Sequence, residues 1–175
     1  MEPTIGAEVS EPKRVLGVVV TSTRAAAGRR PDLTGPRIAD WGREQGFEIN
    51  GPHVIADGPK VADLLRELVG AGCALIVTTG GTGFTEDDHT PEATAAVVDR
   101  PAPGISEAIR ARGLKKTSHA SLSRGVSGIA GRTLIVNLPG STGGVRDGLE
   151  VLAQVADHAL DQLGHGELAA HETHG

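Results

Sequence analysis

Residues 73–83 read CALIVTTGGTG, an apolar run that passes directly into a stretch of threonine and glycine. The apolar part is short and rich in aliphatic side chains, which predicts a strand buried on both faces over Cys73 to Thr78. Val15 to Thr21 and Arg132 to Leu138 have the same character. Helical patterns separate the three runs, so the sequence predicts an α/β fold with a largely parallel sheet.

Apolar spacing and capping residues mark the expected helices. Thr34 is the expected N-cap of a helix that contains Pro36 in its first turn, and Thr90 is the expected cap of a helix that begins at Pro91. Further elements are expected at Phe47–Ile55 (a weak strand at a sheet edge), Val61–Val69 (a helix), Ile105–Arg112 (a short helix) and Val145–Leu163 (a long helix).

The composition indicates one domain with an aliphatic core. The chain has 175 residues, a formal net charge of −5, two Phe, one Trp and no Tyr. It therefore offers neither the positive field nor the aromatic platforms typical of nucleic-acid binding. No apolar run approaches the roughly 18 residues of a membrane span, and a single cysteine excludes an internal disulfide. We expect a cytoplasmic protein without nucleic-acid or membrane partners, with one domain over residues 14–163 and disordered tails at 1–13 and 164–175.

Glycine is unusually frequent, with 25 residues, about twice average usage. Seven of these glycines lie in polar loops that follow the three expected strands: an arginine loop with Arg24, Arg29 and Arg30, the Gly-Thr loop (residues 78–83), and the Pro-Gly-Ser turn (residues 139–144). Ligands of parallel sheets bind beyond the carboxyl ends of the strands. We therefore expect these three loops to line one crevice.

The Gly-Thr loop combines three threonine hydroxyls with glycines, whose backbone can adopt positive φ and approach an anion closely. It lacks the Gly-Lys-Ser/Thr ending of a Walker A loop, and Glu86 stands where the dinucleotide fingerprint requires a third small residue. A tight strand-to-helix turn is the alternative explanation. The number of small residues, and the carboxylates that follow them, favour a phosphate site.

Three carboxylates, Glu86, Asp87 and Asp88, follow the Gly-Thr loop. They would repel a bound phosphate, since two unit charges about 4 Å apart interact by roughly 4 kcal/mol at an effective dielectric near 20. The pattern therefore predicts Mg²⁺, which takes one or two protein carboxylates together with substrate phosphates. Asp88 is the favoured ligand because it lies nearest the helix start. A solvated acidic turn is the alternative.

The Pro-Gly-Ser turn leads from a strand into a helix, so the N–H groups of Ser141 to Gly144 can bind an anion. A plain N-cap at Ser141 or Thr142 explains the pattern equally well. The arginine loop likewise has two explanations, a phosphate clamp or a solvated surface.

Several segments match one known family. They are Thr78 to Gly83, Asp88, Thr90-Pro91-Glu92-Ala93 and Asn137-Leu138-Pro139-Gly140-Ser141. Together they resemble the molybdopterin adenylyltransferases, the Mog/MoaB family akin to the gephyrin G domain, from about Val15 to Leu163. Molybdenum-insertion proteins and CinA-type pyrophosphatases share this motif string. The shortness of the chain favours the stand-alone adenylyltransferase.

The resemblance implies a three-layer α/β/α sandwich with a mostly parallel sheet and a homotrimeric assembly. It implies transfer of AMP from Mg-ATP to the terminal phosphate of molybdopterin, so that Mg²⁺, ATP and molybdopterin are the expected ligands. Asp57 and Asp88 are then the expected catalytic and metal-binding carboxylates. The expected substrate-binding residues are Thr78, Thr79, Gly80, Gly81, Thr82, Gly83, Glu92, Pro139, Gly140, Ser141 and Arg24.

The chain departs from the family pattern at three positions. Ser22-Thr23 stands where the family often has Ser-Asp, Asp87 replaces a common basic residue, and Gly143-Gly144 stands where a lysine often follows. With two positive contacts missing, the arginine loop would have to contribute more. The alternatives are a non-catalytic molybdopterin-binding or carrier protein, a CinA-type nucleotide pyrophosphatase, and a purely structural module.

Overall fold

The computed structural model describes residues 12–166, which form a six-stranded sheet with the order β2-β1-β3-β6-β5-β4. The first four strands in this order are parallel neighbours, and β5 and β4 are added in antiparallel pairings. The predicted α/β class with a mostly parallel sheet is therefore confirmed. The strands are β1 (Val15–Thr21), β2 (Glu48–Ile55), β3 (Leu75–Thr79), β4 (Arg100–Pro101), β5 (Ser127–Ala130) and β6 (Thr133–Leu138).

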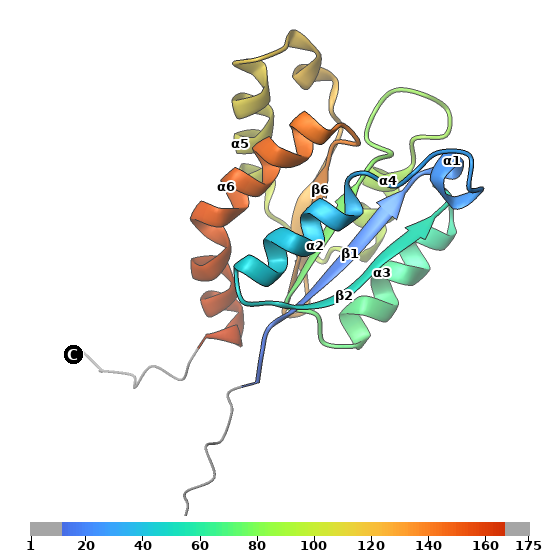
Figure 1. Ribbon diagram of the computed structural model, residues 1–175. Helices are drawn as coiled ribbons and strands as arrows, with labels where there is room; N and C mark the ends of the chain where they lie inside the picture. The colour runs from blue at the N-terminus through green and yellow to red at the C-terminus, as the bar shows by residue number, and fades with distance from the viewer. Residues whose placement is uncertain (1–11, 167–175) are drawn as a thin grey trace, which may run out of the picture.

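Helices cover both faces of the sheet (Figure 1). One face carries α2 (Gly35–Glu44) and α6 (Thr142–Leu160), and the other carries α3 (Lys60–Gly70) and α4 (Thr90–Val97). Successive side chains of a strand point to opposite faces, so neighbours such as Val18 and Val19 belong to different apolar clusters. Because both faces are covered, the central strands read as continuous apolar runs rather than as alternating ones.

Residues 103–125, called the roof segment below, contain α5 (Pro103–Leu114) and the 3-10 helix η1 (Ser118–Leu122). The roof segment packs beside α6. Two ion pairs, Arg112 with Glu150 and Lys116 with Asp147, connect it to α6. The remaining elements are α1 (Thr23–Ala26) and the short final turn η2 (Asp161–His165).

The edge position expected for residues 47–55 is confirmed by β2, whereas β4 and β5 are not predicted by the sequence. These two strands have only two and four residues. They include Pro101 and Gly128, and both residue types are depleted in strands. The pairing of β4 with β5, and of β5 with β6, therefore has no clear signature in the local sequence.

Two predicted caps are wrong in their chemistry. Thr34 is at the N-cap position of α2, but its side chain makes no capping bond. Asp32 Oδ1 instead accepts hydrogen bonds from Thr34 N at 3.1 Å and Gly35 N at 2.9 Å. Thr90 is the first residue of α4, after the N-cap His89. Its hydroxyl donates to Thr21 Oγ1 at 2.9 Å, a partner 69 positions away that local sequence does not reveal.

The described chain continues past the expected domain end at residue 163. Arg14 Nε donates to His165 O at 2.8 Å, and Arg132 Nε donates to Leu163 O at 2.9 Å, so these residues contact the fold. The rest of the expected tails, 1–11 and 167–175, lies outside the described residues. None of the helices within residues 12–166 combines the length and apolar character needed to cross a membrane.

Candidate functional site

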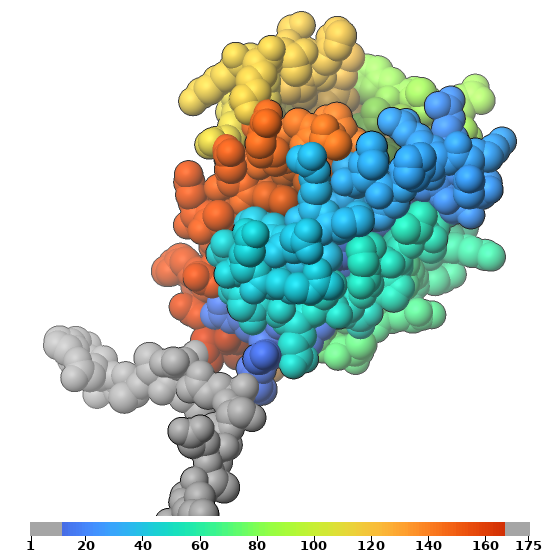
Figure 2. All heavy atoms as spheres, viewed as in Figure 1, coloured from blue at the N-terminus to red at the C-terminus, as the bar shows by residue number. Residues whose placement is uncertain are grey.

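The carboxyl ends of β1, β3 and β6 meet at one edge of the sheet, where Thr79 is in register with Val20 and Leu138. The neighbouring strands β1 and β3 are followed by connections in opposite directions, because the chain passes from β1 to β2 on one side and from β3 toward β4, β5 and β6 on the other. Such a switch point is where open α/β sheets bind ligands. Figure 2 shows the segment after β1 (blue), the roof segment (yellow) and the start of α6 (orange) gathered at this end of the molecule.

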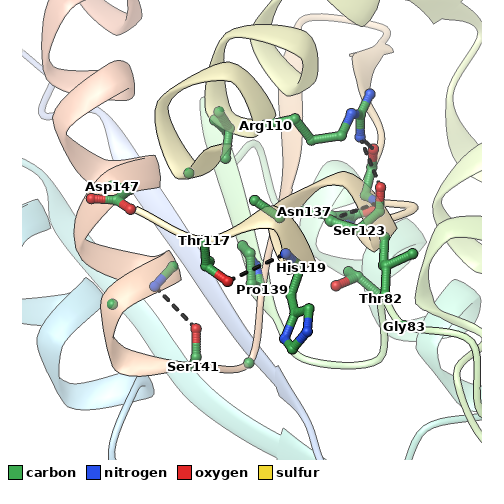
Figure 3. Close-up of a pocket in the computed structure, with 18 of the residues that line it drawn as sticks. Thr82, Gly83, Arg110, Thr117, His119, Ser123, Asn137, Pro139, Ser141 and Asp147 are labelled. Carbon is green, nitrogen blue, oxygen red and sulfur yellow. Dashed lines mark hydrogen bonds between the residues drawn. The ribbon is translucent and has the colours of Figure 1, made fainter. Parts of the chain in front are cut away.

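A first cleft of about 540 Å³ opens between the Gly-Thr loop and the roof segment. Gly80 to Gly83 and Asp88 line one side, and Pro139 to Ser141 line another. Thr117 and His119 of the roof segment face this turn across the cleft (Figure 3). The structure thus brings together, in one cleft, most of the residues that the sequence assigned to substrate.

A second cleft of about 410 Å³ lies between the arginine loop and the Pro-Gly-Ser turn. Arg30 lines it, together with Thr79 and the residues Gly80, Gly140 and Ser141 that also line the first cleft. The two turns approach so closely that a Cβ on Gly140 would lie 3.3 Å from Gly80 Cα. The second cleft therefore adjoins the first at this pair of glycines.

Arg24, expected to bind substrate, is exposed on α1 and does not line either of these two clefts. Arg29 likewise lies outside both. Of the three candidates in the arginine loop, the structure brings only Arg30 to the site.

Two glycines of the Gly-Thr loop have left-handed backbone, with φ of 93° at Gly80 and 66° at Gly81. A Cβ on Gly81 would lie 2.0 Å from Asp57 Oδ2 and 2.2 Å from Thr90 Oγ1. No side chain fits there without displacing these groups. The glycines are required because other parts of the protein pack directly against the loop.

Thr78 and Thr79 are completely buried, and their hydroxyls bond within the protein. Thr79 Oγ1 donates to Pro139 O at 2.8 Å, which ties the two turns together. Asn137 Nδ2 donates to Thr78 Oγ1 and to Thr94 Oγ1, both at 2.9 Å. These side chains support the loop from below. Thr82, which is also buried, lines the first cleft.

Asp57 lies under the Gly-Thr loop rather than along the cleft wall. Its Oδ2 accepts hydrogen bonds from His89 N at 3.0 Å and Thr90 Oγ1 at 3.3 Å. Its Oδ1 is buried and has no hydrogen-bond partner among the described residues. Burial raises the pKa of the Asp57 carboxyl above its ordinary value, although these hydrogen bonds act in the opposite direction.

Asp88 lines the first cleft, and its hydrogen bonds from Thr85 N and Thr85 Oγ1, at 3.0 and 2.8 Å, both use Oδ2. Oδ1 is left for another partner. Asp57 and Asp88 thus each have a carboxylate oxygen of the kind that Mg²⁺ binds, but only Asp88 lines the first cleft, whereas Asp57 Oδ1 is buried beneath the loop. Residues 12–166 contain no group of three or more side chains suited to holding a metal, so phosphate and water would have to complete the coordination.

Ser141 caps α6, because its Oγ accepts a hydrogen bond from Gly144 N at 3.0 Å. The capping explanation of the Pro-Gly-Ser turn is therefore correct. It does not exclude anion binding, since the first turn of a helix has four N–H groups without intrahelical partners. Ser141 and Gly143 line the first cleft beside these groups.

Residues 17–158 match the family described as "probable molybdopterin binding domain". The chain belongs to this family. The match spans most of the described residues, including most of β1, the Gly-Thr loop, Asp88 and the Pro-Gly-Ser turn.

Named members of the family support the assignment. The molybdopterin adenylyltransferase of Haemophilus influenzae is 39% identical over 140 residues, which cover 77% of this chain and 71% of that protein. The molybdenum cofactor biosynthesis bifunctional protein of Synechococcus elongatus is 35% identical over 163 residues, 90% of this chain. This chain spans only 51% of that protein's length, and between 17% and 22% of two other relatives.

The solved structure of the molybdopterin biosynthesis Mog protein from Mycobacterium ulcerans has the same fold, with a TM-score of 0.84 and 50% identity. The likeness covers 89% of this chain and 99% of that one. The fold and the family assignment thus agree.

In this family member, Glu92 is not part of the cleft wall. It is an exposed residue of α4 that forms an ion pair with Arg124, and the hydrogen bond from Arg124 lowers the pKa of the Glu92 carboxyl. Sequence reasoning missed Arg124, and it quoted the buried Asn137 as part of the family motif without assigning it a role. Arg124 lies in a polar stretch without periodicity and has no local signal, whereas the role of Asn137 depends on its contacts with Thr78 and Thr94 in two other elements.

Proposed function

We propose that this chain is a molybdopterin adenylyltransferase, which transfers AMP from Mg-ATP to the terminal phosphate of molybdopterin and releases pyrophosphate. The observation that carries the proposal is that two clefts share Gly80, Gly140 and Ser141. Two phosphate-bearing ligands, one in each cleft, would meet at this boundary, and joining them requires such proximity. The names of the relatives agree with this chemistry.

The proposed reaction needs little covalent help from the protein. A terminal phosphate oxygen of molybdopterin attacks the α-phosphorus of ATP. A P–O bond forms to this oxygen, and the bond to the pyrophosphate oxygen breaks with its electron pair. The nucleophile is already an anion, so no general base is needed. The chain has to align the phosphates and balance their charge.

Particular residues suit these tasks. The N–H groups at the start of α6, beside Ser141, bind a phosphate, and Arg30 contacts a phosphate in the second cleft. Asp88 and Asp57 would hold Mg²⁺ through their Oδ1 atoms. When bound, Mg²⁺ supplies positive charge to the polyphosphate beside the carboxylates.

A non-catalytic molybdopterin-binding protein is the second candidate. The departures at Thr23, Asp87 and Gly143 favour it, because they remove polar or basic contacts. Among the described residues that line the second cleft, Arg30 is the only cationic one. A nucleotide could therefore be held less firmly there than turnover requires.

Release of pyrophosphate from ATP and Mg²⁺, measured with and without molybdopterin, tests the proposal. We expect release only when molybdopterin is present, with an adenylylated product of matching mass. Binding of molybdopterin without release would favour the carrier protein. Release without molybdopterin would favour a nucleotide pyrophosphatase.

Asp88→Ala tests the carboxylate assignment. We expect the variant to fold and to lose Mg²⁺-dependent AMP transfer, because the cleft loses the oxygen best placed for the cation. Asp87→Ala is the matched control, since Asp87 is exposed and does not line either of the two clefts. Normal turnover by folded Asp88→Ala protein would disprove the assignment.

We also propose a homotrimer in the cytoplasm, as the resemblance and the composition predict. Light scattering would then give a mass near three times the 17.9 kDa of one chain.

A further inference from the structure

Arg124, a half-buried residue just after η1, contacts the floor of the first cleft through three groups. Its backbone N–H donates to Thr82 O at 2.8 Å. Its Nε donates to Gly83 O at 2.8 Å, and its Nη2 donates to Asp88 O at 2.7 Å. One residue of the roof segment thus holds three backbone carbonyls of the segment between β3 and α4.

Glu92 completes this arrangement from the first turn of α4. Its carboxylate pairs with Arg124 Nη1, the nitrogen that does not bond the loop. Three different guanidinium nitrogens therefore have three different acceptors. The planar fork of arginine suits this set, whereas a lysine ammonium presents its donors from one atom. Glu92 thus orients Arg124 without contacting the cleft.

The contacts also determine where the loop amides point. In a trans peptide the C=O of one residue and the N–H of the next point in opposite directions. Because the carbonyls of Thr82, Gly83 and Asp88 face Arg124, the N–H groups of Gly83, Phe84 and His89 point away from it. The last of these donates to Asp57 Oδ2, so the peptide that follows Asp88 is held from both sides.

We propose that Arg124 is a positioning residue of the candidate site, which turns three loop carbonyls away from the ligand and fixes Asp88 in place. An anion in the first cleft beside Gly83, which lines it, then meets the N–H group of Gly83 instead of carbonyl oxygens. Without the guanidinium, nothing else in the described chain bonds Gly83 O or Asp88 O. We call the three hydrogen bonds from Arg124 to these loop carbonyls the clamp. The effect of Arg124 on catalysis rests on the proposed function, whereas the clamp itself does not.

Hydrogen exchange tests the clamp independently of any activity. Removing Arg124 should speed exchange of the amides at residues 85 and 88–90 by about tenfold or more, as expected for lost charge-assisted hydrogen bonds. Arg132→Ala is the matched control, because Arg132 also donates to two backbone carbonyls, those of Leu163 and Gly164, away from the site. It should speed exchange there and leave the loop unchanged.

Two variants keep the test decisive. Arg124→Ala removes the fork, and Arg124→Lys keeps the charge and most of the packing should the alanine variant fail to fold. Low millimolar guanidinium should restore part of the loop protection in Arg124→Ala, whereas urea should not, because only the cation replaces the missing donors. Unchanged loop exchange in either folded variant would overturn the clamp.

Adenylyl transfer then tests the positioning role. We expect both Arg124 variants to lose about 100-fold in kcat/KM, the scale of a misplaced reacting group, with partial rescue of Arg124→Ala by guanidinium. Arg132→Ala should keep wild-type kcat/KM. An equal loss in both alanine variants would mean that the effect comes from general stability, and would overturn the positioning role. If the wild-type protein transfers no AMP, the proposed function fails, and the exchange data still decide the clamp.

Discussion

The Gly-Thr loop and the Pro-Gly-Ser turn both leave a central strand at the same edge of the sheet, yet they are built differently. Ten residues, Gly80 to His89, separate β3 from α4, whereas only three, Pro139 to Ser141, separate β6 from α6. The short turn is completed locally by the Ser141 cap. The longer loop depends on Asp57 and Arg124, which lie far away in the sequence.

The two segments thus show two ways of orienting the N–H groups of a binding surface. Residues close in the sequence can do so (local control), or side chains from distant parts of the chain can do so (distributed control). The amides of the short turn are aligned by the helix that follows, so they keep their direction as long as α6 forms. The amides of the longer loop are aligned by side chains from two other parts of the chain, Asp57 and Arg124. Changes at the loop should therefore be more damaging than equivalent changes at the turn.

Gly81→Ala should have the largest effect on stability. The new Cβ would meet Asp57 Oδ2 at 2.0 Å, and the backbone at φ 66° is unfavourable for any other residue. We expect a loss of about 1–3 kcal/mol in the free energy of unfolding, measured by urea denaturation. Gly143→Ala in the first turn of α6 is the control, because a Cβ there meets nothing within 4 Å. Equal losses of unfolding free energy in the two variants would contradict the conclusion that the Gly-Thr loop is more sensitive to substitution than the Pro-Gly-Ser turn.

Ser141→Ala should have a smaller effect, confined to the start of α6. Loss of the hydrogen bond from Gly144 N to Ser141 Oγ should cost about 1 kcal/mol, again measured by urea denaturation. Ser141→Asp keeps an acceptor at the cap and should restore stability, but it should weaken phosphate binding by repulsion. A loss above about 2 kcal/mol in Ser141→Ala would show that the turn is not controlled locally.

The same contrast explains what the sequence could predict. The apolar runs predict β1, β3 and β6, because strands buried on both faces need no partner to be recognised. The cap at Ser141 is also readable, since the acceptor and donor are three residues apart. The convergence of the Gly-Thr loop, Asp88 and the Pro-Gly-Ser turn follows from parallel strands with adjacent carboxyl ends.

The scaffold of the longer loop could not be predicted, because its contacts cross the fold. Thr90 has the composition of a helix cap, but its hydroxyl bonds Thr21 and Asp57. Thr79 has a hydroxyl suited to a ligand but donates it to Pro139 O. Arg124 holds a loop more than 35 positions earlier through its side chain. In each case the hydrogen-bond partner depends on the order of the strands in the sheet, which no local sequence pattern predicts.

Asp57→Asn should have the smallest effect on stability, and its sign should depend on pH. Burial raises the pKa of the folded Asp57 carboxyl above its ordinary value of 3.8, so the folded state binds more protons than the unfolded state between the two pKa values. The free energy of unfolding attributable to this group therefore falls as pH rises through that window, and the loss is complete above the folded pKa. The amide variant has no such titration, so its stability relative to wild type should increase from about pH 4 and then level off. Thermal unfolding of both proteins without divalent metal or nucleotide measures this difference. Parallel stability curves would show that the buried Asp57 carboxylate carries no desolvation cost, and would contradict this part of the comparison between the Gly-Thr loop and the turn at Ser141.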